Sequence, residues 1–150
     1  MLFLLSLLST AEAEPINGFR VNACAGIASH CPMLQVGFSF NTKRVAVDFG
    51  GFVGFPFGGH AGLQVYPSGN DKNRWFVGAS VGGATALVAS IGAYGGYIGR
   101  DFHLLKSRKL IITPRIGYDV GTFILFGGTA GTATEEGSTV SFSLETAYAF

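Results

Sequence analysis

Apolar and polar residues alternate along most of this chain, and turn-forming residues interrupt the alternation at intervals. The segment 139–150 shows the pattern most clearly, because its large apolar residues share one parity while small or polar residues hold the other. These apolar residues are Val140, Phe142, Leu144, Tyr148 and Phe150. A period of two is typical of a β-strand whose two faces meet different surroundings. The chain is therefore predicted to be all-β.

Further segments follow the same rule, although glycines blur it in 91–103. They are 19–27, 34–40, 45–53, 58–66, 74–83, 91–103 and 109–121. Pro114 occupies an apolar position of 109–121, and a proline cannot donate to a ladder of hydrogen bonds, so we expect a bulge or another local irregularity there. About eight strands of this length predict a closed antiparallel up-and-down barrel that crosses a membrane.

The connections between these strands alternate between two kinds. Three are short, polar and charged, namely 41–44, 68–73 and 105–109. The others carry less charge, and the last is long: 29–32, 55–58, 85–89 and 122–137. Short turns at the end that holds both termini, and a longer loop at the other end, are typical of outer-membrane barrels. We expect loop 122–137 to offer a surface for a partner, although its residues 123–126 (Phe-Ile-Leu-Phe) equally allow an extension of the preceding strand.

The composition favours a lipid environment for the apolar faces. Hydrophobic residues make up 48% of the chain and charged residues only 13%, with 23 glycines. A soluble domain usually has about a quarter charged residues, so these strands have too little charge for a water-facing surface. The net charge of +1 comes without a basic run, which excludes nucleic acid as a partner. The most apolar later stretch, 84–98, is broken by glycines, so no helical membrane span is expected.

If the apolar face meets lipid, the opposite face fills a narrow lumen. Its charged residues are Arg20, Asp48, Arg115, Asp119 and Glu145, and we expect them to form a polar network inside the barrel. Glycines on the same face leave room for large neighbours such as Arg115. Eight strands enclose just enough space for side chains, so a salt-bridged plug is favoured over a pore.

The chain begins with a predicted signal peptide, residues 1–13. An apolar run over residues 2–8 is followed by Ala11 and Ala13, the spacing that a signal peptidase recognises, so the barrel domain is assigned to 14–150. Export places Cys24 and Cys31 in an oxidising compartment. A disulfide across one hairpin and two buried thiols are both compatible with their spacing.

This pattern resembles the small outer-membrane β-barrel superfamily of Gram-negative bacteria, the OmpA, OmpX and opacity-porin-like domains. The likeness rests on the signal peptide, the stretch 65–83 (VYPSGNDKNRWFVGASVGG) and the terminal strand SFSLETAYAF. In that family the barrel assembly machinery recognises a C-terminal aromatic residue with apolar residues at set distances before it. Phe142, Leu144, Tyr148 and Phe150 match this signal, and Thr146 departs from it. The resemblance implies outer-membrane lipid and the assembly machinery as partners.

No catalytic, metal or cofactor signature accompanies the barrel pattern. Some related barrels modify lipid A with a His/Ser pair, but His30, His60 and His103 are not followed by such a serine motif. Cys24, His30 and Cys31 lack a fourth ligand for zinc. We therefore expect a non-enzymatic barrel with a structural or surface-interaction role. The alternatives are a lipid A-modifying enzyme, a narrow channel for small solutes and a soluble lipocalin-like binder, which would carry its apolar face inward.

Overall fold

The computed structural model describes residues 18–29, 31, 33–52, 57–68, 74–104, 109–127 and 131–150, and within them every regular element is a β-strand. The predicted signal peptide lies outside this part of the chain. The strands are β1 (Gly18–Ile27), β2 (Met33–Asn41), β3 (Val45–Phe52), β4 (Phe57–Val65), β5 (Trp75–Thr85), β6 (Ala89–Arg100), β7 (Phe102–Leu104), β8 (Leu110–Gly127) and β9 (Gly131–Ala149). In the described ranges no helix is long and apolar enough to cross a membrane.

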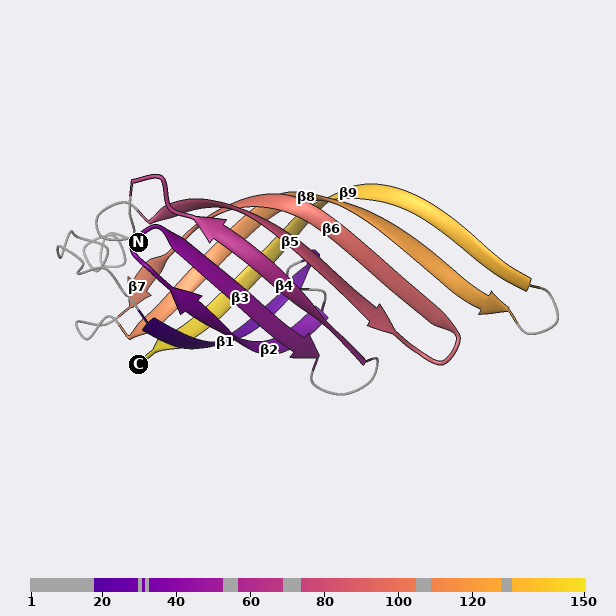
Figure 1. Ribbon diagram of the computed structural model, residues 1–150, viewed down its shortest axis with the longest axis horizontal. Coiled ribbons are helices and arrows are strands. Elements are labelled where there is room, and N and C mark those ends of the chain that lie inside the picture. The colour runs from indigo at the N-terminus through magenta and orange to yellow at the C-terminus, as the bar shows by residue number, and fades with distance from the viewer. Residues whose placement is uncertain are drawn as a thin grey trace, which may run out of the picture.

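The strands close into an antiparallel barrel of eight strands, with β7 as a short extra strand. Consecutive strands pair with one another except β6 and β7; β6 pairs instead with β8, and β1 pairs with β9. The predicted up-and-down barrel is thus confirmed. β1 begins and β9 ends at the same end of the barrel (Figure 1), which we call the terminal end, and there the backbone N–H of Phe150 donates to the carbonyl of Phe19 at 3.2 Å.

The two faces of each strand differ as the alternation predicts. Outward residues such as Phe142 and Val77 are 60% and 49% exposed, whereas Arg115 and Glu145 are both only 4% exposed. Charged side chains therefore fill the lumen and apolar side chains cover the outside. This is the reverse of the lipocalin-like alternative, which needs an apolar interior.

The prediction of a long loop at 122–137 is wrong. β8 continues to Gly127 and β9 begins at Gly131, with Thr122 opposite Glu136 in an unbroken register. The alternative interpretation, that residues 123–126 extend the preceding strand, is the one the structure shows. The β-branched residues Ile124, Thr132 and Thr134 favour this pairing over a loop. Together with β5 and β6, these strands form an arm that projects beyond the other strands (Figure 1).

The irregularity predicted at Pro114 is present, but it is not a bulge. Pro114 pairs with Leu144 in a register that runs through it without an extra residue. The interruption lies on the other side, where β6 ends at Arg100 and β7 begins at Phe102. Both strands pair with β8 in the same register. A missing N–H at Pro114 accounts for a ladder that breaks at this point.

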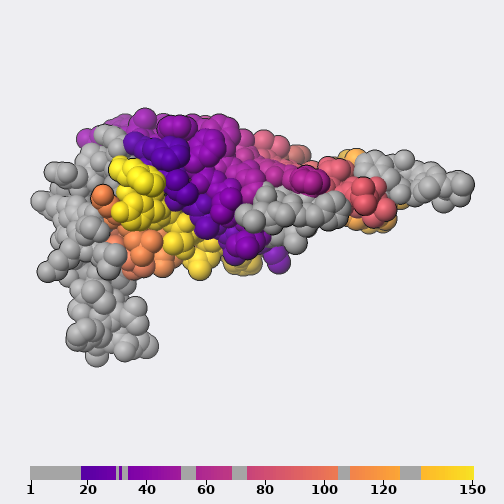
Figure 2. All heavy atoms as spheres, turned by 90° about the horizontal axis from the view of Figure 1, so that it is seen from below, coloured from indigo at the N-terminus to yellow at the C-terminus, as the bar shows by residue number. Residues whose placement is uncertain are grey.

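Inward glycines make room for large inward side chains. A Cβ on Gly78 would lie 2.5 Å from Cζ of Tyr97, and one on Gly62 would lie 2.7 Å from a carboxylate oxygen of Asp48. A Cβ at either position would force the neighbouring side chain to shift, so glycine at both positions makes room for Tyr97 and Asp48 in the lumen. In Figure 2 the molecule is thick at the barrel body and narrows toward the arm.

Candidate functional site in the barrel interior

The lumen near the chain termini is organised around Asp101, between β6 and β7. Its carboxylate accepts hydrogen bonds from Arg20 Nη1 at 3.1 Å, Tyr66 OH at 3.2 Å and Thr113 Oγ1 at 2.8 Å. All four residues are buried. The alternation of residues predicts Arg20 in the lumen, but Asp101 was not predicted as its partner. The signal was available, because Asp101 continues the inward parity of Tyr97 and Gly99 past the glycine-blurred part of the strand.

The next group of residues pairs Arg115 with Glu145, two of the predicted lumen residues. Arg115 Nη2 lies 2.7 Å from Glu145 Oε2, and both side chains are buried. The guanidinium also lies 5.7 Å from the ring centre of Phe76 and 5.4 Å from that of Tyr97. Aromatic faces attract a desolvated cation, so this arginine is held by one carboxylate and two rings.

A third group surrounds Asp48. His60 Nε2 lies 2.9 Å from one Asp48 oxygen, and Gln64 donates to the other at 3.1 Å. The second ring nitrogen of His60 lies 2.5 Å from Gln35 Oε1. Both ring nitrogens therefore have partners, and neither is a serine. His103 lies in β7 at the terminal end, and His30 is outside the described residues.

Aromatic rings fill the space between these groups. Tyr66, Phe76 and Tyr97 are at most 6% exposed, and their rings pack in sequence at centroid distances of 5.3 and 6.2 Å. Phe76 and Tyr97 were not predicted as lumen residues, although both occupy inward positions of their strands. These three buried rings therefore pack together inside the body of the barrel.

The mouth of the lumen, at the end of the barrel opposite Asp101, is built differently. Asp119 on β8 accepts hydrogen bonds from the backbone N–H of Ser29 at 2.9 Å and from its hydroxyl at 2.6 Å. The Ser80 hydroxyl lies 2.7 Å from Ser29 Oγ. Ser29 belongs to the connection after β1, which folds inward, since Ala28, Ser29 and Cys31 are all buried. A disulfide joins Cys31 to Cys24 on β1 and holds this connection across the lumen.

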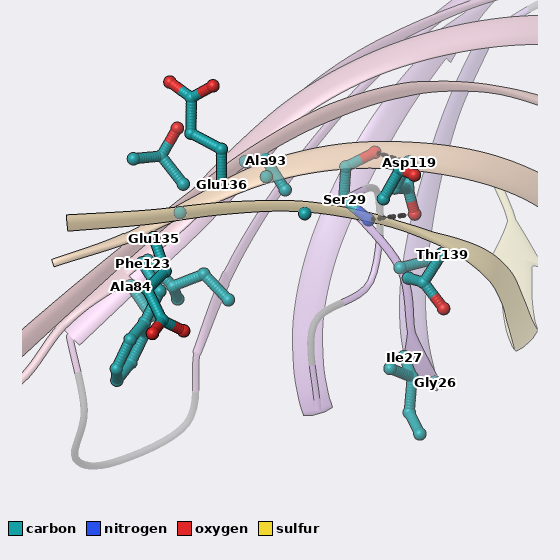
Figure 3. Close-up of a pocket in the computed structure, with 18 residues that line it drawn as sticks. Gly26, Ile27, Ser29, Ala84, Ala93, Asp119, Phe123, Glu135, Glu136 and Thr139 are labelled. Atoms are coloured by element: carbon teal, nitrogen blue, oxygen red, sulfur yellow. Dashed lines mark hydrogen bonds between the residues drawn. The ribbon is translucent and has the colours of Figure 1, made fainter.

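A cavity of about 570 Å³ lies beside the Ser29–Asp119 contact, between the inward-folded connection and the arm. Figure 3 shows Asp119 and Ser29 on one side of it and Glu135, Phe123 and Ala84 on the other. Its wall is mainly aliphatic and glycine surface. None of the three groups of charged residues deeper in the lumen belongs to this wall.

The five predicted lumen residues are all buried, and part of the predicted network is present. Gln64 donates to Asp48 and accepts from Tyr66 OH, which also lies within hydrogen-bond distance of Asp101, the partner of Arg20. Arg115 pairs with Glu145, and Asp119 lies apart at the mouth. Phe142, Leu144, Tyr148 and Phe150 line up on the outer face and are exposed. Their role as an assembly signal stays a prediction.

Comparison with known proteins finds no matching family model, no matching curated protein and no matching solved structure. Across the described ranges, no group of three or more His, Cys, Asp or Glu side chains is arranged to hold a metal ion. The function of this protein is therefore inferred from the geometry of the barrel.

Proposed function

We propose that this protein is an outer-membrane barrel with a structural or surface-interaction role, and that its own side chains close its lumen. One observation carries the proposal: large apolar side chains cover the outside of the barrel while arginines and carboxylates are buried inside it. In water this arrangement would expose a wide hydrophobic surface, which soluble monomers avoid. In lipid it buries that surface and leaves no strand edge unpaired within the closed part.

The height of the apolar surface fits a bilayer. On β9 it extends from Tyr148 to Val140, roughly 27 Å at about 3.4 Å per residue. A strand tilt of about 40° reduces this height to roughly 21 Å, close to the apolar band of about 25 Å in outer-membrane barrels.

Aromatic residues border the apolar surface at both ends, as interfacial girdles do. At the terminal end Trp75 and Phe102 flank Arg100, whose guanidinium lies 5.4 and 5.1 Å from their ring centres. At the other end Tyr118 OH donates to Ser138 Oγ at 2.6 Å. These girdles are where lipid headgroups would meet the barrel.

The interior favours a plug over a channel. Two arginine–carboxylate pairs and an aromatic cluster occupy the body of the lumen, and the connection after β1 covers its mouth. The lipid A-modifying alternative needs a histidine free to activate a serine, but both ring nitrogens of His60 already have partners.

Cell fractionation combined with gel mobility tests the proposal. We expect the full chain in the outer-membrane fraction, and a detergent-extracted band that migrates differently when boiled and unboiled. In planar bilayers the purified barrel should show no steady conductance. A water-soluble monomer without heat-dependent mobility would overturn the membrane role, and a steady open-channel current would overturn the closed lumen.

A further inference from the structure

Where the arm leaves the barrel, the outward face of the sheet changes from apolar to polar, and the inward face changes from polar to apolar. The last apolar outward row of the arm strands is Val81, Tyr94 and Val120, which lie opposite one another on β5, β6 and β8. The next outward row is small or polar: Gly83, Gly92, Thr122 and Glu136. On the inward face the order is reversed, because Ser80 and Asp119 are followed by Ala84, Ile91 and Phe123. The inner face of the arm is thus apolar on β5, β6 and β8, and β9 adds Glu135 opposite Phe123.

A row of small residues lies between the polar and apolar rows of this inner face. Gly82, Ala93, Gly121 and Gly137 stand opposite one another across β5, β6, β8 and β9. They project almost nothing from the sheet, so the backbone itself forms the wall. This row creates the space of the mouth cavity, and all four residues line it.

Asp119 differs from the other buried carboxylates. Asp101, Glu145 and Asp48 each contact a basic side chain: Arg20, Arg115 and His60 respectively. Asp119 is 5% exposed, and it accepts hydrogen bonds from the backbone N–H and the hydroxyl of Ser29. Among the described residues it has no basic partner within 4.0 Å. A buried carboxylate is usually paired with a cation, and this one borders a cavity.

The cavity as a whole favours a positive charge. Asp119 and Glu135 contribute inward carboxylates to its wall, whereas the Glu136 carboxylate points to the other face of the sheet (Figure 3). Among the described residues, its lining includes no lysine, arginine or histidine. The remaining wall is largely apolar, with Ile91 and Phe123 as its larger side chains. Cavities of about 300–1,000 Å³ hold small organic ligands, and the volume of about 570 Å³ falls in this range.

We propose that the mouth cavity binds a small amphipathic amine, whose ammonium group contacts the Asp119 carboxylate and whose apolar body lies on the Gly/Ala row against Ile91 and Phe123. The ligand supplies the cation that the protein places beside the other buried carboxylates. Ser29 orients the carboxylate by occupying one lone pair on each oxygen, which leaves acceptor capacity toward the cavity. This site goes beyond the structural role, and it depends on the protein wall alone rather than on where the barrel resides.

Binding of two isosteric probes to the full chain in zwitterionic lipid nanodiscs tests the proposal. The probes are 2-naphthylmethylamine, which is a cation at neutral pH, and 2-naphthalenemethanol, which is neutral. Titration calorimetry, corrected with empty nanodiscs, measures both affinities. Because a charge-assisted hydrogen bond strengthens binding about tenfold or more, we expect the amine to bind at least about tenfold more tightly than the alcohol. Asp119→Asn should remove this preference and leave the alcohol unaffected.

A matched pair of glycine variants tests the location independently of charge. A Cβ on Gly137 or on Gly92 would meet nothing within 4 Å, so both positions accept a side chain without a clash. Gly137 lines the cavity, whereas Gly92 lies on the outward face of the same arm. Gly137→Leu should abolish binding of both probes, and Gly92→Leu should change neither affinity.

Equal affinity for the two probes, an unchanged preference in Asp119→Asn, or full binding by Gly137→Leu would each overturn the proposed site. These failures are distinguishable from a failure of the membrane role. A barrel that shows heat-dependent mobility but no amine preference keeps its proposed function and loses only this site.

Discussion

The barrel body and the arm use the same alternation of residues for opposite purposes. In the body, the inward parity carries Arg115 and Glu145, and the outward parity carries Val140 and Phe142. In the arm, the inward parity carries Ile91 and Phe123, which lie opposite one another, and the outward parity carries Gly92 and Thr122. A period-two pattern therefore indicates that the inward and outward faces of a strand differ. Which of the two faces is apolar depends on the surroundings of each segment.

The two regions also differ in how closely they are packed. Inward glycines of the body lie against side chains that a Cβ would strike, as Gly78 does against Tyr97. In the arm, Gly92 and Gly137 have open space around them. The body behaves as a packed core, while the arm keeps room beside its sheet. Variants at equivalent positions in the two regions can test this difference.

The largest effect is expected from breaking the pair in the body. Glu145→Ala removes the carboxylate partner of Arg115 and leaves a buried guanidinium uncompensated, which costs about 3–5 kcal/mol. The free energy of unfolding, measured by urea titration in lipid vesicles with gel mobility as the readout, should fall by this amount. The double variant Arg115→Met/Glu145→Leu should recover most of the loss. A double variant as unstable as the single one would contradict this account.

The next effect compares two outward positions on β9. Leu144 lies midway along the apolar surface, so Leu144→Arg places a charge in the bilayer centre at a cost of about 2–4 kcal/mol. Thr134 points outward on the arm, above the last apolar row, and Thr134→Arg should change the free energy of unfolding by less than about 0.5 kcal/mol. The same vesicle titration measures both. Equal costs at the two positions would mean that the arm is embedded as deeply as the body.

The smallest effect compares two glycines. Gly78→Ala forces the Tyr97 ring to move in a filled lumen, and overpacking of this kind costs about 1–3 kcal/mol. Gly137→Ala, at an inward position of the arm, adds a methyl group in open space and should change the free energy of unfolding by less than about 0.5 kcal/mol. The ratio of folded to unfolded bands after refolding measures the difference. An unaffected Gly78→Ala variant would show that the lumen is not close-packed.

Strand number, closure and the parity of each strand were predictable, because period-two alternation is a local property of the residues. The partners of the charged side chains were not. Arg20 meets Asp101 across a distance of 81 residues, and such a contact depends on the register of many strands together. The extension of β8 was predicted only as an alternative over residues 123–126, and the start of β9 at Gly131 was not predicted. Glycines and small residues hide the alternation in this segment, whereas continuous backbone pairing with β8 holds it as a strand.

The mouth cavity was also beyond prediction from the sequence. Its wall needs the small residues of four strands to fall in one row, which only the register determines. Asp119 was predicted as a lumen residue like the others. What distinguishes it is the inward-folded connection that brings Ser29 to it, and no alternation pattern describes that connection.

The seam between β1 and β9 carries a consequence for how the molecule is made. The other pairs join consecutive strands or, for β6 and β8, strands separated by the three-residue β7, but this one joins residues as far apart as Arg20 and Ala149. The barrel cannot close before β9 has been synthesised, so closure is a late step in folding. Without β9 the sheet would stay open, and its two edge strands would expose unpaired backbone groups that favour aggregation. Since both ends meet there, a circular permutant that links residue 150 to residue 18 and opens at 128–130 would preserve every strand pairing while turning the seam into an ordinary hairpin.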